Sequence, residues 1–179
     1  MTKRNKVFIA TSLDGYIADK KGGIDWLHSI PNPDLNDMGY KDFMQSVDAL
    51  VMGRTTFETV CGFEIDWPYQ KPVFVLSNKL REIPNQYKNK AFLVNGKLKN
   101  IIEEINQKGF QSLYIDGGAT IRSFLKEDLI DEMIITKIPI LLGGGTPLFG
   151  ELNSPLSFKC TKSKIYLDQV VQNHFVRNY

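Results

Sequence analysis

An apolar strand that ends at a glycine and leads directly into a helix constrains this chain more than any other feature. Val51-Met52 is followed by Gly53-Arg54-Thr55-Thr56, so a glycine, a basic residue and two hydroxyl residues open the predicted helix. The N-terminus of a helix has unpaired N–H groups and a partial positive charge, and it therefore attracts anions. We predict a phosphate or pyrophosphate site at this turn; the alternative is an ordinary strand-to-helix turn with a solvated arginine.

The same pattern occurs a second time, where the strand Tyr114-Ile115-Asp116 is followed by Gly117-Gly118-Ala119-Thr120. Adjacent glycines allow the backbone to approach a ligand closely, although the full G-x-G-x-x-G fingerprint is absent. The alternative is a tight turn between a strand and a helix. Two phosphate-sized sites in one small α/β protein suggest a dinucleotide.

Strand and helix patterns alternate along most of the 179 residues. Strands are predicted at 6–12, 49–53, 72–76, 91–94, 112–116, 132–139, 158–165 and 170–177, and helices at 34–46, 55–61, 98–108 and 120–126. Alternation followed by strands alone indicates an α/β fold with a mostly parallel sheet and an antiparallel C-terminal hairpin. We find no linker, repeat or low-complexity segment, so residues 1–179 are expected to form a single domain.

Composition excludes several classes of function. The net charge is only +2 and both signs are interspersed, so neither nucleic acid nor a membrane is an expected partner. Two cysteines and two histidines do not support a metal centre, a disulfide framework or a Ser-His or Cys-His triad. No signal-peptide pattern follows the basic residues at the start, and we expect a cytoplasmic protein. Catalysis would then depend on carboxylates or on a cofactor.

Five stretches in order resemble the dihydrofolate reductase fold family. The closest resemblance is to its branch of the riboflavin-biosynthesis reductase C-terminal domain (the bifunctional deaminase-reductase C-terminal domain) and its stand-alone relatives. The stretches are 12–18, 52–58, 75–78, 115–118 and 134–149. The resemblance implies a three-layer fold with a central sheet of about eight strands, and a homodimer. It also implies an NADPH-dependent oxidoreductase that acts on a pterin-like or aminopyrimidine heterocycle.

Within this family, the motif style is most like the 5-amino-6-(5-phosphoribosylamino)uracil reductase. Two alternatives stay open, namely a dihydrofolate reductase and a non-catalytic dinucleotide-binding module. Fold analogy alone does not select the substrate.

The resemblance also implies which residues hold NADPH. The two glycine turns would hold the pyrophosphate, and the ends of neighbouring strands would contact the rest of the cofactor. The residues are Ala10, Gly15, Gly53, Arg54, Thr55, Thr56, Ser77, Asn78, Ile115, Gly117, Gly118, Ala119 and Thr120.

A proton donor is needed to reduce a C=N bond, and a buried carboxyl with a raised pKa can supply one. The folate-reducing enzymes place an acid on the first helix, and the matching position here is Asp37, with Thr136 as its partner. These two residues are the predicted catalytic pair. Asp34 or Asp37 could instead cap the helix or lie in its first turn.

Four residues are predicted to bind the substrate: Ser12, Asp14, Trp26 and Tyr40. The segment from Gly15 to Trp26 is predicted to form a mobile lid. The alternatives are a plain turn at Asp14-Gly15 and core-filling roles for Trp26 and Tyr40. Further along, Gly143-Gly144-Gly145 predicts close approach of the backbone to a ligand or to another subunit.

Overall fold

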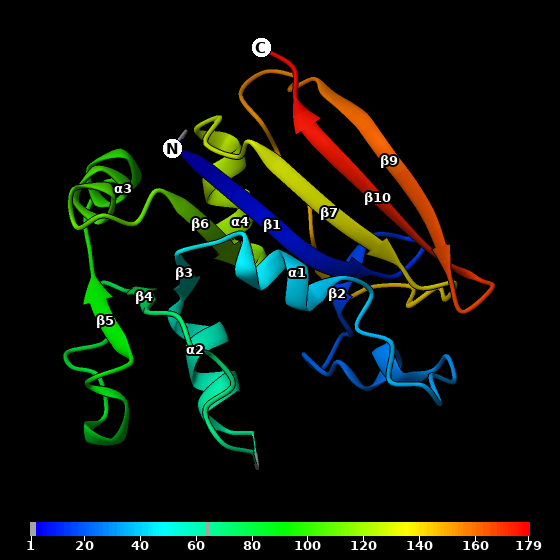
Figure 1. Ribbon diagram of the computed structural model, residues 1–179, viewed down its shortest axis with the longest axis horizontal. Coiled ribbons are helices and arrows are strands. Elements are labelled where there is room, and N and C mark those ends of the chain that lie inside the picture. Colours follow the sequence, from blue (N-terminus) through cyan, green and yellow to red (C-terminus); the bar gives the residue numbers. More distant parts are fainter. Residues whose placement is uncertain (1–2, 64) are drawn as a thin grey trace.

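The computed structural model describes residues 3–63 and 65–179, and a twisted sheet of eight strands forms its centre (Figure 1). The strands are β1 (Arg4–Thr11), β3 (Ala49–Gly53), β4 (Val73–Leu76), β5 (Ala91–Val94), β6 (Ser112–Asp116), β7 (Glu132–Lys137), β9 (Phe158–Tyr166) and β10 (Val170–Arg177). Their order is β5-β4-β3-β6-β1-β7-β10-β9. All pairs from β5 to β7 are parallel, and β10 is antiparallel to both β7 and β9. The predicted mostly parallel sheet with an antiparallel C-terminal hairpin is confirmed.

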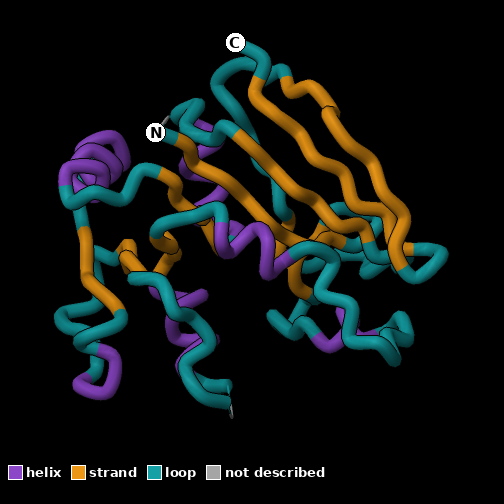
Figure 2. The backbone as a smooth tube through the Cα atoms, viewed as in Figure 1, coloured by secondary structure: helices purple, strands orange, loops and turns teal. Residues whose placement is uncertain are grey.

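Helices cover both faces of the sheet and make the fold three-layered. They are α1 (Tyr40–Gln45), α2 (Arg54–Cys61), α3 (Leu98–Gln107) and α4 (Gly118–Lys126). One apolar cluster joins the sheet to α1 and α2, and a second joins it to α3 and α4. Figure 2 shows the helices grouped around the short strands β3 to β6, whereas β7, β9 and β10 extend beyond them. Two short 3-10 helices, η1 (Asp25–His28) and η2 (Asn85–Tyr87), lie in loops.

The central strands form because their side chains are apolar on both faces. In β3, Leu50 and Met52 point toward α1 and α2, and Val51 points toward α3 and α4. This alternation is the two-residue period of a strand, and a strand buried on both faces reads as a continuous apolar run. Phe57 of α2 and Phe124 of α4 are fully buried and pack from opposite sides. The layers therefore position β3 and β6 firmly in the middle of the sheet.

The predicted helix at 34–46 is wrong in its first half, because α1 begins only at Tyr40. Leu35 and Met38 have positive φ angles of 47° and 52°, which a right-handed helix does not contain. The side chain of Asn32 accepts a hydrogen bond from the N–H of Asn36 at 2.9 Å and closes a local turn. Such side-chain-to-backbone bonds compete with helix formation.

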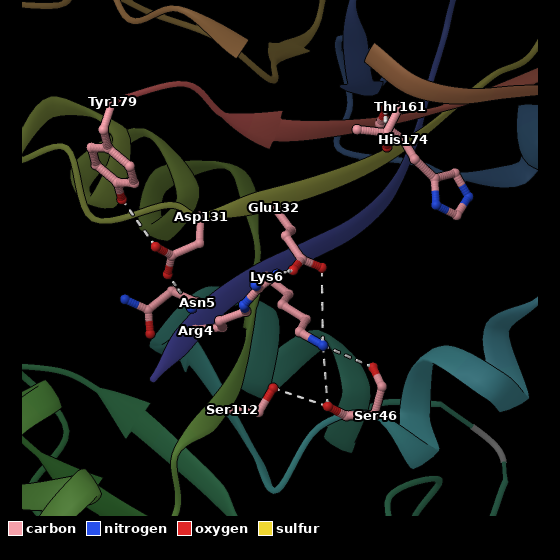
Figure 3. A network of polar contacts seen from close by, with 10 residues as sticks. All are labelled: Arg4, Asn5, Lys6, Ser46, Ser112, Asp131, Glu132, Thr161, His174 and Tyr179. Atoms are coloured by element: carbon pink, nitrogen blue, oxygen red, sulfur yellow. Dashed lines mark hydrogen bonds and ion pairs between the residues drawn. The ribbon is translucent and has the colours of Figure 1, made fainter. Parts of the chain in front are cut away.

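A network of polar contacts holds the amino-terminal edge of the sheet (Figure 3). Asp131 accepts hydrogen bonds from the N–H of Asn5 at 2.6 Å and from the hydroxyl of Tyr179 at 3.0 Å. Arg4 forms an ion pair with Glu132. These contacts join the start of β1, the start of β7 and the C-terminal residues of the chain.

Candidate functional site

A cleft of about 760 Å³ crosses the carboxyl-terminal ends of the parallel strands. The helix that follows β3 lies on one face of the sheet, and the helix that follows β6 lies on the other. Because β3 and β6 are neighbours, their two helices diverge and leave a crevice between them. Crevices at such topological switch points are the usual ligand sites of open α/β sheets.

The N-termini of α2 and α4 meet in this cleft, and neither has a side-chain cap. The two turns are packed against each other. A Cβ atom on Gly117 would overlap the hydroxyl of Thr56, and one on Gly53 would lie 3.0 Å from the hydroxyl of Thr120. The first N–H groups of both helices therefore have no partner within their helix and face a shared space. This donor set fits a pyrophosphate.

Most of the residues predicted to hold the cofactor line this one cleft. Ile115 and Gly15 do not. The side chain of Ile115 is fully buried in the core toward α3 and α4, and Gly15 lines a groove elsewhere. The predicted residues that the structure brings together are Ala10, Gly53, Arg54, Thr55, Thr56, Ser77, Asn78, Gly117, Gly118, Ala119 and Thr120.

Two of these residues already have partners within the protein. The guanidinium of Arg54 donates to both carboxylate oxygens of Glu58, at 2.8 and 2.6 Å, one turn further along α2. The hydroxyl of Ser77 accepts hydrogen bonds from the two backbone N–H groups of Lys79 and Leu80. Arg54 is therefore held beside the cleft with its charge balanced, and Ser77 shapes the turn after β4.

Asp116 ends β6 at the cleft, and its carboxyl is the most perturbed acid in the described part of the chain. Its Oδ1 accepts a hydrogen bond from the N–H of Gly117 at 2.8 Å. Burial raises its pKa to about 6. The hydrogen bonds with the N–H of Gly117 and with the side chain of Tyr114 lower the pKa but do not offset the effect of burial. The nearby phenol of Tyr40 has its pKa raised to about 12, by burial and then by the charge of Asp116. A carboxyl that titrates near neutrality in a cleft is suited to proton transfer.

Asp37 lies outside the cleft and does not have the environment of a proton donor. It is exposed, and its two carboxylate oxygens accept the N–H groups of Gly39 and Lys41, each at 3.0 Å. These backbone hydrogen bonds, first that of Lys41, lower its pKa. Asp37 is not the N-cap residue of α1, which is Gly39; its carboxylate instead binds backbone N–H groups just before and within the first turn of α1.

Thr136, the predicted partner of Asp37, is buried on β7 and also does not line the cleft. Its hydroxyl accepts a hydrogen bond from the amide of Gln172 at 2.9 Å, and the same amide donates to the carbonyl of Met38 at 3.0 Å. Gln172 is thus a buried link between β7 and the segment before α1. No pattern in the sequence marks this residue.

Ser12 and Asp14 form a turn that fixes a neighbouring loop. The carboxylate of Asp14 accepts hydrogen bonds from the hydroxyl of Ser12 at 2.6 Å and from the N–H groups of Leu142 and Gly143 at 3.1 and 2.8 Å. These contacts, first that of Ser12, lower the pKa of Asp14. Neither residue lines the cleft, so the structure does not bring them to the predicted substrate site.

Trp26 and Tyr40 pack within the protein. Trp26 is 8% exposed and lies against Ile138 and Val170, where it anchors the loop that carries Ile24 and Leu27 into the cleft. Tyr40 packs edge-on against Phe8, with ring centroids 5.5 Å apart. The lid predicted at 15–26 therefore contributes to the cleft through Ile24 and its neighbours rather than through Trp26.

Comparison with known proteins identifies the family of this chain. The model of the RibD C-terminal domain matches residues 6–172. This chain belongs to the RibD C-terminal domain family. The Bacillus subtilis protein YwjB is 37% identical over 180 residues, which cover 99% of each chain.

Two solved structures have the same fold as this chain. A proposed riboflavin biosynthesis protein from Shewanella sp. PV-4 has a TM-score of 0.96 and 61% identity, covering 98% of this chain and 99% of its own. A dihydrofolate reductase from Enterococcus faecalis has a TM-score of 0.68 and 17% identity, covering 98% and 97% of the two chains. The predicted dihydrofolate-reductase-like fold is confirmed.

Among the three consecutive glycines, Gly144 and Gly145 allow two segments of the chain to approach each other closely. A Cβ on Gly145 would overlap the carbonyl of Ala18, and one on Gly144 would lie 2.5 Å from the side chain of Lys20. Both glycines also have positive φ angles, of 141° and 140°. They allow the short strand β8 (Thr146–Pro147) to pair with β2 (Tyr16–Ala18). The close approach predicted from the sequence is therefore to the chain's own residues 18–20.

Several cleft residues were missed by sequence reasoning. Phe63 and Tyr69 come from the loop after α2, which has no periodic pattern, so nothing in the sequence marks them. Gly96 lies two residues after β5 and Gly53 is the last residue of β3, so Gly96 could have been found as another glycine between a strand and a helix. In the described residues, no group of three or more His, Cys, Asp or Glu side chains could hold a metal ion, and none of the helices has the length and apolarity needed to span a membrane.

A separate groove of about 620 Å³ lies over β7 and β10, on the face that carries α4. Its floor is apolar and includes Met133, Ile135 and Phe175. Leu13 and Phe149 line it and are 51% and 49% exposed. An exposed apolar surface of this kind indicates an interaction site.

Proposed function

We propose that this chain is an NADPH-dependent reductase of a flat nitrogen heterocycle of the aminopyrimidine or pterin type. One observation carries the proposal. Two uncapped helix N-termini converge in a cleft that also contains a half-buried carboxyl with a pKa near 6. Family membership supports it, and so does the fold shared with a dihydrofolate reductase that was solved in complex with NADP(H).

The residues around the two turns would hold the cofactor. The N–H groups at the start of α2 and α4 would donate to its pyrophosphate, and Arg54 would lie at the adenosine phosphate. Asn78 and Gly96 extend the same cleft along the ends of β4 and β5. NADPH bound there supplies a hydride for the heterocycle.

Asp116 would hold the proton that the reduced nitrogen requires. Its Oδ1 accepts a hydrogen bond from the N–H of Gly117, and the protonated carboxyl would donate from Oδ2. Because its pKa is about 6, the carboxyl is about half protonated near pH 6 and about one tenth protonated at pH 7. Asp116 thereby takes the role that the sequence resemblance assigned to Asp37.

Apolar side chains would orient the ring and exclude water from it. Ile24 and Leu27 reach the cleft from the loop anchored by Trp26, and Phe63 and Tyr69 reach it from the loop after α2. Walls of this kind sandwich a flat heterocycle and leave few polar groups to set its orientation. The substrate would be positioned by shape, and its reacting nitrogen by Asp116.

The test has two stages that separate binding from turnover. The pure protein is titrated with NADPH, and NADPH oxidation is then followed by absorbance with 7,8-dihydropterin, dihydrofolate and a ribosylaminopyrimidinone in parallel. We expect NADPH to bind and to be oxidised only when a heterocycle is added. Binding without oxidation by any heterocycle would favour a non-catalytic dinucleotide-binding module, and absence of NADPH binding would refute the proposal.

We further propose that the chain is a homodimer that buries the apolar groove over β7 and β10. Leu13, Phe149 and Leu152 form an exposed apolar rim around it. Sedimentation velocity should show a dimer for the wild type and a monomer for Leu152→Glu. Leu35→Glu is the matched control, because Leu35 is 84% exposed and does not line the groove.

A further inference from the structure

Positive charge in the cleft is confined to the region where α2 and α4 begin. Of the described residues that line the cleft, Arg54 and Arg122 are the ones with a cationic side chain. Arg54 is paired with Glu58, and Arg122 donates to the carbonyl of Pro147. This region already receives the cofactor phosphates in the proposed function. The cleft therefore has no second set of cations for another phosphate.

Beyond that region, the described residues that line the cleft are uncharged apart from Asp116; they include the polar Ser77, Asn78 and Asn95 as well as apolar side chains. Ile24, Leu27 and Phe63 are apolar, and Tyr69 has a half-buried phenol whose pKa is raised by burial and then by the charge of Asp116. Among the described residues, Asp116 is the acid that lines the cleft, and in its ionised form it repels an anion placed there.

We infer that the substrate of this chain is an uncharged planar heterocycle without a phosphate group, enclosed by Ile24, Leu27, Phe63 and Tyr69 with its reacting nitrogen at Asp116. The inference rests on the proposed function and narrows its substrate class. It departs from the phosphoribosyl substrate that the sequence resemblance implied. A phosphate needs several N–H or guanidinium donors, and burying it beside a carboxylate without them is unfavourable.

The first experiment uses a matched pair of ligands. The ribosylaminopyrimidinone and its 5′-phosphate differ only in the phosphate, and 7,8-dihydropterin serves as a second uncharged probe. Each is titrated by calorimetry into protein saturated with NADP⁺. We expect the unphosphorylated form to bind at least tenfold more tightly than the phosphate, and dihydropterin to bind as well.

A second experiment introduces a positive charge at the wall of the cleft that carries Phe63. Phe63 lines the cleft and is 40% exposed, so Phe63→Arg should fold normally and provide a guanidinium at the substrate wall. The ratio of the two affinities should shift by about tenfold toward the phosphate, as expected for one charge-assisted contact. Phe63→Gln is the matched control, because it removes the aromatic ring without adding charge, and its ratio should stay as in the wild type.

The outcomes separate this inference from the proposed function. Equal or tighter binding of the phosphate form to the wild type would overturn the inference, and its turnover would leave the reductase proposal intact. Failure of both uncharged probes to bind would also overturn it. NADPH oxidation in the presence of dihydropterin, dihydrofolate or either form of the aminopyrimidinone, measured separately, then decides whether the chain is a reductase at all.

Discussion

The two edges of the sheet use their carboxylates in opposite ways. At the amino-terminal edge, Asp131 accepts hydrogen bonds from Asn5 and Tyr179, and Asp128 accepts two from Arg177 at 2.7 and 2.9 Å (Figure 3 shows the Asp131 contacts). At the carboxyl-terminal edge, Asp116 has a single backbone donor at 2.8 Å and a pKa raised to about 6. The carboxylates at the amino-terminal edge have several hydrogen-bond partners, whereas the ionised form of Asp116 at the carboxyl-terminal edge is disfavoured by burial.

Backbone N–H groups show the same contrast. At the amino-terminal edge, Asp48 accepts the N–H groups of Gln111 and Ser112 at 2.9 and 2.8 Å. At the carboxyl-terminal edge, the first N–H groups of α2 and α4 have no side-chain cap. Native proteins rarely leave such groups without partners, and the exceptions are expected where a ligand completes them. The satisfied edge therefore contributes stability, and the unsatisfied edge is the candidate site.

Replacing Asp116 should give the largest effect, because it removes the proposed proton donor. Asp116→Asn should lower kcat by about 10²- to 10³-fold, the usual contribution of general acid catalysis, while the Kd for NADPH changes less than threefold. Asp37→Asn is the matched control and should change kcat less than threefold, because Asp37 lies outside the cleft and its carboxylate accepts backbone N–H groups at the start of α1. Steady-state kinetics with a fluorescence titration measures both. The reverse ranking of the two variants would return the acid role to Asp37.

Gly117→Ala should disrupt the contact between the two helix N-termini. The new Cβ would overlap the hydroxyl of Thr56, and the φ angle of 87° adds backbone strain. We expect a loss of about 2–3 kcal/mol in the free energy of unfolding and at least tenfold weaker NADPH binding. Gly109→Ala has a similar φ of 98° with nothing within 4 Å, so it should cost only about 1 kcal/mol and leave NADPH binding unchanged. Equal effects of the two variants on NADPH would contradict the proposed role of the paired turns.

The strands were predictable from sequence because burial on both faces produces continuous apolar runs such as Ala49–Met52. The glycine turns were predictable because backbone chemistry requires glycine there. The first helix was not, since Asn32 and Asp37 form local side-chain bonds that override its apolar pattern. The proposed role of Asp116 could not be predicted either. Burial raises its pKa, and its charge in turn raises the pKa of Tyr40 and Tyr69, which are distant in sequence and come near β6 only in the fold.

Arg54→Ala tests whether Arg54, at the carboxyl-terminal edge, makes the cleft prefer NADPH over NADH. If Arg54 contacts the adenosine phosphate, the variant should bind NADPH about tenfold more weakly and NADH nearly as well as the wild type. Fluorescence titration with both cofactors measures the difference. Glu58→Gln is an informative companion, because it releases the guanidinium from its ion pair and should strengthen NADPH binding slightly. Equal weakening of NADPH and NADH would exclude a selective phosphate contact.

The raised pKa of Asp116 should also make the free energy of unfolding depend on pH. Its folded pKa of about 6 lies above the ordinary value of 3.8, so the folded state binds the proton more tightly and loses stability as the pH rises from 4 to 6. Asp116→Asn should therefore raise the free energy of unfolding by about 1–2 kcal/mol at pH 8 and have no effect near pH 4. Urea denaturation at both pH values measures this. A loss of stability at pH 8 would mean that the carboxylate is satisfied by contacts like those at the opposite edge.

Asp128 at the amino-terminal edge should respond to pH in the opposite direction, with the smallest effect. The hydrogen bond from Arg177 lowers its pKa, so its contribution is present at neutral pH and is lost as the pH falls through the folded pKa, below 3.8. Its side chain is 39% exposed, and solvent screening limits the effect of Asp128→Asn to about 0.5 kcal/mol at pH 7. Kinetic constants should not change, because Asp128 lies at the edge of the sheet that has no part in the cleft. Urea denaturation and steady-state kinetics on the same variant test both statements. A change in kcat would show that the two edges are coupled through the sheet.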